Sequence, residues 1–151
     1  MMDFLNTLWA NQILLAAFTA WGLAQIIKVP LDYLINREWD WGLLLSSGGM
    51  PSSHSALVTG ASVAIGLQLG FDSPLFALAS VVAVVVIYDA IGVRRHAGDH
   101  ARVLNLMIDE LLTGHPLAEK ELKEVLGHTP REVIGGIILG TVVAIVMMRL
   151  L

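Results

Sequence analysis

Four apolar stretches separated by polar segments dominate the pattern of hydrophobic and polar positions along the chain. A membrane-spanning helix needs roughly 20 mostly apolar residues, and about 17–25 are tolerated. Lys28-Val29-Pro30 closes the first stretch, and the second reaches a spanning length only if its helix begins near Ser52. We therefore expect an all-α fold, a multi-pass transmembrane helical bundle. Its predicted spans are residues 8–27, 52–69, 74–91 and 133–151.

The composition agrees with a membrane protein. Hydrophobic residues make up 56% of the chain and charged residues 15%, and the mean hydropathy is +0.72. An average soluble domain has about 45–50% apolar residues even with glycine included, and about 25% charged residues. These values exclude a disordered chain and a nucleic-acid-binding protein that relies on a basic surface. The chain has no cysteine, which excludes a disulfide scaffold, a thiolate metal site and a cysteine nucleophile.

The basic residues are concentrated in two long connections between the spans, residues 28–50 and 92–132. Together these connections hold eight of the nine Lys and Arg residues, whereas the tight turn 70–73 holds none. Cytoplasmic loops of membrane proteins carry an excess of Lys and Arg. We therefore predict a single integral domain, residues 1–151, in the cell membrane, with both long connections cytoplasmic and both termini outside. Because two crossings separate the two connections, both lie on the same side of the membrane, and residues from both can form one site.

The second connection contains a segment, residues 102–112, with a broad apolar face. This pattern predicts an amphipathic helix within the 92–132 connection, lying at the membrane interface or packed under the bundle. In the first connection, Trp39 and Trp41 fit an aromatic belt at the interface.

Two pairs of glycines have the spacing that lets helices approach closely: Gly66 with Gly70, and Gly136 with Gly140. Both ordinary packing inside one subunit and a homodimer contact through these small-residue faces fit the spacing. The sequence leaves the two alternatives open.

A stretch rich in glycine and serine, residues 48–55, leads directly into the second span. Glycine gives the backbone freedom, and proline and serine begin helices. The N–H groups and the positive dipole end of a helix start form a ready anion site. His54 adds a titratable donor in the first turn. The alternative is a cluster of capping serines beside a solvated histidine.

A similar stretch, residues 127–133, begins the last span. Thr129 and Glu132 have capping-box spacing and Pro130 takes the first helical position, so Glu132 can simply cap the helix. Glu132 also follows His128 by four residues. Its carboxylate could hold the imidazole by one nitrogen and leave the other as nucleophile or base.

The third span ends in a segment that carries Asp89, Arg94 and Arg95. Paired arginines are natural phosphate ligands, because the guanidinium fork matches the phosphate oxygens. The alternative is that both arginines only anchor the span at anionic headgroups. Asp89 is costly at membrane depth unless it is paired, so we expect it to bind an arginine or to line a polar site.

The histidines at two helix starts, together with the cations Lys28, Arg94 and Arg95, converge on one face of the predicted bundle. This set suits phosphoryl transfer through a phosphohistidine. It offers cations for the equatorial oxygens, a nucleophilic histidine, and a second histidine to protonate the leaving oxygen.

A metal site is a further alternative, built from the five histidines His54, His96, His100, His115 and His128. Against it, no cysteine contributes and Gly98 and Asp99 lie between His96 and His100. We predict that the protein uses no metal and no cofactor.

Three segments of the chain, GGMPSSHSALVTG, YDAIGVRRHAG and LGHTPREVIGG in that order, resemble the divergent branch of the type 2 phosphatidic acid phosphatase family. This branch is related to acid phosphatases and vanadium-dependent haloperoxidases, and the resemblance extends from about Lys28 to the C-terminus. It implies a membrane phosphatase that hydrolyses a phosphomonoester or diphosphate of a lipid or isoprenoid at the cytoplasmic face. The partners so implied are that substrate and the bilayer, with no nucleic acid.

The resemblance also implies roles for individual residues. The family's Pro-Ser-Gly-His motif matches residues 51–54 and makes His54 the general acid. Its third motif ends in a pattern that matches residues 128–132, which makes His128 the nucleophile, with Glu132 in place of aspartate. We expect phosphate binding by Arg94, Arg95, Lys28, Ser52 and Ser53, with support from Asp89 and Arg37.

The chain departs from the parent family at two motifs. Leu122 stands where the family has an arginine, so Arg94 or Arg95 would supply that charge. Lys28 and Arg37 are nine residues apart, and Glu38 rather than proline follows. The branch also has fewer spans than the parent's six-helix core. These departures favour a second hypothesis, a catalytically degenerate protein that binds or transports a lipid phosphate.

Overall fold

The computed structural model describes residues 6, 7, 9–37, 39–45, 48–92, 100, 103–108 and 129–151. Within these ranges every regular element is helical, so the all-α prediction is confirmed for this part of the chain. The elements are α2 (Gln12–Asn36), the short 3₁₀ helix η1 (Trp41–Leu44), α3 (Ser53–Leu69), α4 (Pro74–Ile91) and α6 (Pro130–Leu150).

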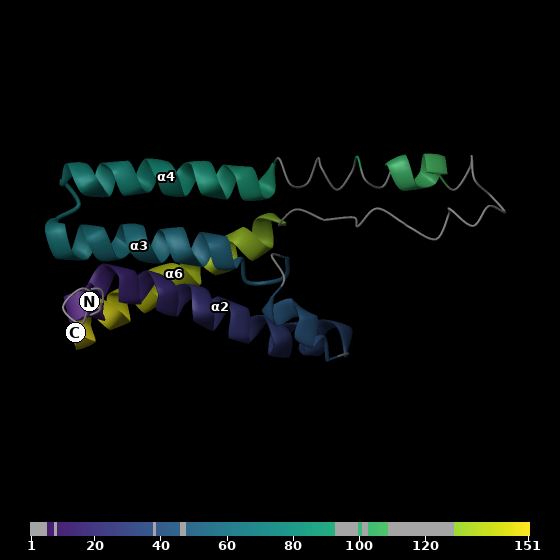
Figure 1. The fold of residues 1–151 in the computed structure, drawn as a ribbon, viewed down its shortest axis with the longest axis horizontal. Coiled ribbons are helices and arrows are strands. Elements are labelled where there is room, and N and C mark those ends of the chain that lie inside the picture. The colour runs from purple at the N-terminus through teal and green to yellow at the C-terminus, as the bar shows by residue number, and fades with distance from the viewer. Residues whose placement is uncertain are drawn as a thin grey trace.

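Helix α3 lies at the centre of the bundle and contacts α2, α4 and α6 (Figure 1). It runs parallel to α6 and antiparallel to α2 and α4, and α4 packs mainly on α3. The two termini lie at one end of the bundle. The ends of α2 and α4 and the starts of α3 and α6 lie at the other. The residues that flank the two long connections are therefore gathered at one end of the molecule.

Three described helices are long and apolar enough to cross a membrane: α2, α4 and α6. Helix α3 coincides with the predicted second span, but its 17 residues extend only about 26 Å at 1.5 Å per residue, against about 30 Å for the hydrocarbon core. The chain is thus a helical membrane protein, and the count of four spans stays a prediction.

Helix α2 continues through the residues that were expected to close it. It passes Lys28, contains Pro30 and ends only at Asn36. Proline removes one backbone donor, and membrane helices tolerate this because neighbouring groups satisfy the freed carbonyl. The prediction that the first span closes at Lys28-Val29-Pro30 is therefore wrong, and Lys28 belongs to the bundle rather than to a connection.

Polar side chains cap the helix starts as the sequence predicted. The Ser52 hydroxyl accepts a hydrogen bond from the Ser55 N–H at the start of α3, and the Thr129 hydroxyl accepts one from the Glu132 N–H at the start of α6. Such bonds satisfy backbone donors that have no acceptor within the helix. Helix α3 thus begins close to Ser52, as expected.

Small residues form the core and bring the helices close together. The fully buried core side chains are mostly alanines, such as Ala20 and Ala56. A Cβ added to Gly140 would lie 2.5 Å from the Ala56 carbonyl oxygen, and one added to Gly60 would lie 3.1 Å from the Ala20 Cβ. The face of α6 that carries Gly136 and Gly140 thus packs against α3 of the same chain. The homodimer stays a prediction.

Only part of the predicted amphipathic helix falls within the described residues. Residues 103–108 are helical, and their apolar side chains Val103, Leu104, Leu106 and Met107 are exposed. The rest of the 102–112 segment lies outside the described residues, so this helix also stays a prediction.

Candidate functional site

Lys28 is a buried cation at the meeting point of three helices. Its side chain is only 1% exposed, and its ammonium donates a hydrogen bond to the Ser53 hydroxyl, with Nζ 3.4 Å from Oγ. The Glu132 carboxylate at the start of α6 acts electrostatically on the same ammonium. A buried charge is costly unless it is paired and hydrogen-bonded. Lys28 therefore ties α2 to α3 through a hydrogen bond and interacts electrostatically with the start of α6.

The segment after η1 covers the aliphatic part of the Lys28 side chain. A Cβ added to Gly49 would lie 3.7 Å from Lys28 Cδ, and Gly49 has φ +85°, a conformation that favours glycine. The Gln25 amide, one turn before Lys28, donates to the Leu44 carbonyl oxygen at 3.1 Å and holds η1 against α2. Sequence reasoning missed Gln25, although its three-residue spacing from Lys28 places both on one helical face.

Ser52 anchors the start of α3 to the start of α6. Its N–H donates to the Glu132 carbonyl oxygen at 2.9 Å. Its hydroxyl accepts from the Ser55 N–H at 3.3 Å and from the Ser55 hydroxyl at 3.0 Å. Both serines are buried. The capping interpretation is therefore confirmed for Ser52, whose N–H and hydroxyl are both engaged in holding the two helix starts together.

The first turn of α3 presents its residues to three different neighbours. Ser53 meets Lys28 of α2, whereas Ser55 lies against α6, where a Cβ added to Gly136 would approach the Ser55 Cβ to 2.9 Å. His54 is half-buried and shares a helical face with Val58, which follows it by four residues and faces α4. The predicted general acid thus lies on the side of α3 that faces α4.

Glu132 contacts the residue that caps its own helix. The Thr129 hydroxyl donates to a carboxylate oxygen of Glu132 at 2.9 Å, and the Glu132 N–H donates to the Thr129 hydroxyl at 3.4 Å. The predicted capping relation between these two residues is confirmed. Since Glu132 also acts on Lys28, its carboxylate is shared between the helix start and the buried cation.

The structure brings together Lys28, Ser52, Ser53 and Glu132, and His54 follows Ser53 in the same turn of α3 but on another face. Asp89 is half-buried in the last turn of α4, at the same end of the bundle.

Arg37 lies apart from this group. It is exposed at the end of α2, about 14 Å further along the helix axis than Lys28. The predicted nucleophile His128 and the predicted phosphate ligands Arg94 and Arg95 lie outside the described residues.

Two of the five histidines of the alternative metal site, His54 and His100, lie within the described residues. Among the described residues, no group of three His, Cys, Asp or Glu side chains could hold a metal ion. His96, His115 and His128 lie outside them. The described polar site is therefore built from an ammonium, hydroxyls, one carboxylate and one imidazole.

Comparisons with known proteins cover nearly the whole bundle. A profile described as "Divergent PAP2 family" matches residues 9–143. A protein of Bacillus subtilis (strain 168), named "Uncharacterized membrane protein YuiD", is 46% identical to this chain over 151 residues, which cover 93% of this chain and 96% of the relative. No solved structure matches. The profile match includes α2, α3 and α4 and the start of α6, where the polar site lies.

Proposed function

The chain belongs to the divergent PAP2 family of membrane proteins, and on that premise we propose that it is a membrane phosphatase acting on a lipid phosphate. The resemblance drawn from the three sequence motifs is confirmed by these comparisons. The proposed substrate is a phosphomonoester or diphosphate of a lipid or isoprenoid, hydrolysed at the cytoplasmic face. Partners are the substrate and the surrounding bilayer.

The observation that supports this function most directly is the burial of Lys28 at the start of α3. Ionisable residues inside membrane bundles usually mark a substrate or ion site. The ammonium donates to the Ser53 hydroxyl in the first turn of α3, at a helix start, where backbone N–H groups point out of the helix. An ammonium beside such a helix start forms a natural site for a phosphate group.

The proposed reaction proceeds in two displacements. His128 attacks phosphorus while Glu132 orients its imidazole, and the bond from phosphorus to the leaving oxygen breaks as His54 donates a proton to that oxygen. Water then attacks the phosphohistidine and gives its proton to His54, which releases inorganic phosphate and restores the enzyme. Lys28, Arg94 and Arg95 stabilise the charge on the equatorial oxygens.

The contacts of Ser52 and Ser53, both predicted phosphate ligands, give the two serines different roles. Ser52 uses its N–H and hydroxyl to join α3 to α6. Ser53 faces Lys28, so we assign the direct phosphate contact at this helix start to Ser53. Ser52 then acts by fixing the distance between the two helix starts, of which one carries His54 and the other follows His128 in the sequence.

The proposed topology places this site at the cytoplasmic surface of the cell membrane, with both termini outside. This topology requires four membrane crossings, so α3 must cross the membrane in addition to α2, α4 and α6. The location of α3 between α2, α4 and α6 supports the assignment, because its neighbours cover its short length. The basic residues that flank the site end of the bundle agree with a cytoplasmic location.

The function is tested by phosphate release from a panel of lipid phosphates by the purified protein. We expect release by the wild type, and a loss of about 10³-fold or more in His128→Ala, because the nucleophile is gone. Val146→Ala, on the exposed face of α6, is the matched control and should retain activity. No release by the wild type, or unchanged release by His128→Ala, would contradict the assignment.

A protein that binds or transports a lipid phosphate without turnover is the second candidate. The altered arginine and lysine motifs, with Leu122 and Glu38 at the changed positions, favour it. The two candidates differ in one covalent intermediate. A phosphohistidine trapped at His128 supports the phosphatase, whereas tight lipid-phosphate binding without hydrolysis supports the second candidate.

A further inference from the structure

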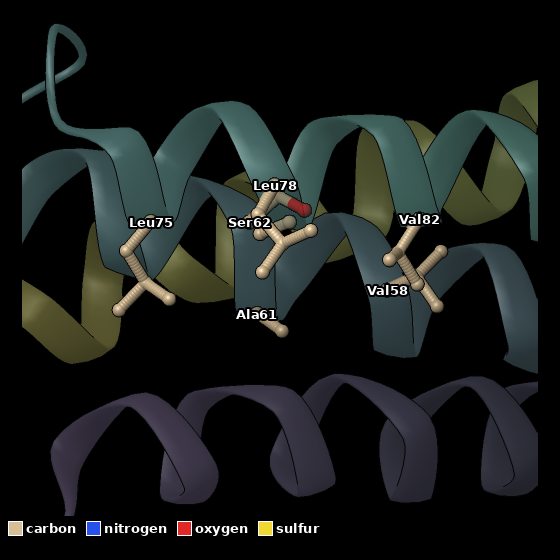
Figure 2. A pocket seen from close by; sticks show the side chains of 7 residues that line it. Val58, Ala61, Ser62, Leu75, Leu78 and Val82 are labelled. Atoms are coloured by element: carbon tan, nitrogen blue, oxygen red, sulfur yellow. The ribbon is translucent and has the colours of Figure 1, made fainter.

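An apolar groove lies between α3 and α4, next to the polar site. Its volume is about 230 Å³. It is lined on one side by Val58, Ala61 and Ser62 of α3, and on the other by Leu78, Ala79 and Val82 of α4 (Figure 2). An apolar cavity of about 150 Å³ is sufficient to bind benzene. The groove is therefore large enough for a segment of a hydrocarbon chain.

The groove begins one helical turn from His54. Val58 and Ala61 follow His54 by four and seven residues, which places all three on one face of α3. Val58 lies about 6 Å further along the helix axis. A ligand whose polar end meets His54 and whose remainder follows this face enters the groove directly.

The groove opens toward the bilayer. Leu78 and Val82 of α4 line it and are 61% and 49% exposed. In a membrane such side chains meet lipid tails, so a hydrocarbon ligand reaches the groove laterally without crossing water.

From this continuity we propose that the groove binds the hydrocarbon tail of the lipid whose phosphate lies at the start of α3. This inference rests on the proposed function and adds to it the part of the molecule that selects the tail. The enzyme then discriminates between substrates with identical phosphate groups by the length of the hydrocarbon that follows.

Ser62 is a position at which a larger side chain would fill the groove. It is 6% exposed, and its hydroxyl oxygen has no hydrogen-bond partner among the described residues. Figure 2 shows this oxygen on the α4 side of α3, beside Leu78. A hydroxyl without a partner is unfavourable against hydrocarbon. Ser62→Ala removes it and keeps the groove open, whereas Ser62→Leu fills the groove.

The test compares two phosphatidic acids with the same headgroup, one with oleoyl chains and one with hexanoyl chains. We expect Ser62→Leu to lower kcat/KM for the oleoyl substrate by about tenfold and to leave the hexanoyl substrate unchanged, since small changes in an apolar pocket have effects of this size. Val146→Leu, which adds bulk on the exposed face of α6 away from the groove, should retain the activity of the wild type on both. Ala79→Leu fills the groove from α4 and should reproduce the selective loss if Ser62→Leu fails to fold. Equal losses on both substrates, or none, would overturn the proposal.

If the protein hydrolyses neither substrate, that result contradicts the proposed function but leaves the binding of the tail to be tested. A second measurement tests tail binding without hydrolysis. Phosphatidic acid with a photoreactive group in its tail is crosslinked to the full chain in detergent, and the adducts are located by mass spectrometry. We expect adducts in residues 58–62 and 78–82, reduced by unlabelled phosphatidic acid but not by phosphatidylcholine. Adducts elsewhere, or equal competition by both lipids, would show adventitious lipid only and would overturn the proposal.

Discussion

Lys28 shows most clearly how one side chain can serve both fold and function. Its ammonium is buried, donates to the Ser53 hydroxyl and interacts electrostatically with the Glu132 carboxylate, at the end of the bundle where α3 and α6 begin. Removal of one of two interacting charges leaves the other without compensation, and the cost in stability grows with the burial of the charge that remains. Stability and activity therefore respond differently to changes at this pair.

We expect Lys28→Met to lower both thermal stability in detergent and phosphate release. The added change Glu132→Leu should restore part of the stability, because it removes the carboxylate charge that Lys28 no longer balances, but not activity, which we expect to stay at least 10²-fold below the wild type. Arg149→Met, at the other end of the bundle, is the control for loss of a cation. Activity restored in the double variant would contradict the role assigned to the ammonium.

The backbone conformation of Arg37 leads to a second prediction at the scale of one residue. It ends α2 with φ 62°, in the left-handed region, and its N–H donates to the Tyr33 carbonyl oxygen. Residues other than glycine lose about 1 kcal/mol in this conformation. Arg37→Gly should therefore raise the midpoint of thermal unfolding, and Arg37→Val should lower it. Because Arg37 lies away from the described site, both variants should keep activity. A large loss of phosphate release in Arg37→Gly would show that its charge supports the site.

The packing of α3 against α6 sets the geometry of the site among the helices. The two helix starts are joined by the hydrogen bond from Ser52 N–H to the Glu132 carbonyl oxygen, and the glycines of α6 allow this approach. The separation of the two helix starts therefore depends on backbone groups and on glycines.

Two glycine substitutions test this dependence. A Cβ at Gly140 would lie 2.5 Å from the Ala56 carbonyl oxygen, whereas one at Gly22 in α2 meets nothing within 4 Å. We expect Gly140→Ala to lower the free energy of unfolding by about 1–3 kcal/mol through overpacking, and to reduce activity. Gly22→Ala should be neutral or stabilising by up to about 1 kcal/mol, since alanine favours helix. Similar stability of the two variants in urea or thermal unfolding would contradict the packing described.

Helix starts were predictable from the sequence because their determinants are local. Ser52 and Thr129 cap helices within three residues of themselves, so their spacing was enough. The end of α2 was not predictable, because continuation through Pro30 depends on packing in the bundle. The electrostatic interaction of Lys28 with Glu132 was equally hidden, since it joins residues far apart in the chain. The contact of Gln25 with Leu44 also depends on how η1 folds back on α2.

The arrangement of the whole molecule makes a prediction about sidedness. The turn between α3 and α4 lies at the end of the bundle that carries the termini, opposite the end of α2. The chain has no cysteine, so single cysteines can be introduced and labelled without a background. In spheroplasts we expect a membrane-impermeant thiol reagent to label Asp72→Cys and not Leu45→Cys, both at exposed positions. The reverse pattern would place the site outside, and labelling of both would contradict the four-span topology.

The central claim is that a phosphate group binds at the start of α3, where Lys28 contacts Ser53 and His54 follows in the same turn. The most direct measurement is a crystal structure of the protein with vanadate, which mimics the phosphoryl group in transfer. We predict vanadate with oxygens about 3 Å from the Lys28 ammonium and from donors in the first turn of α3. Vanadate bound elsewhere, or no vanadate at the start of α3 at saturating vanadate, would contradict the claim.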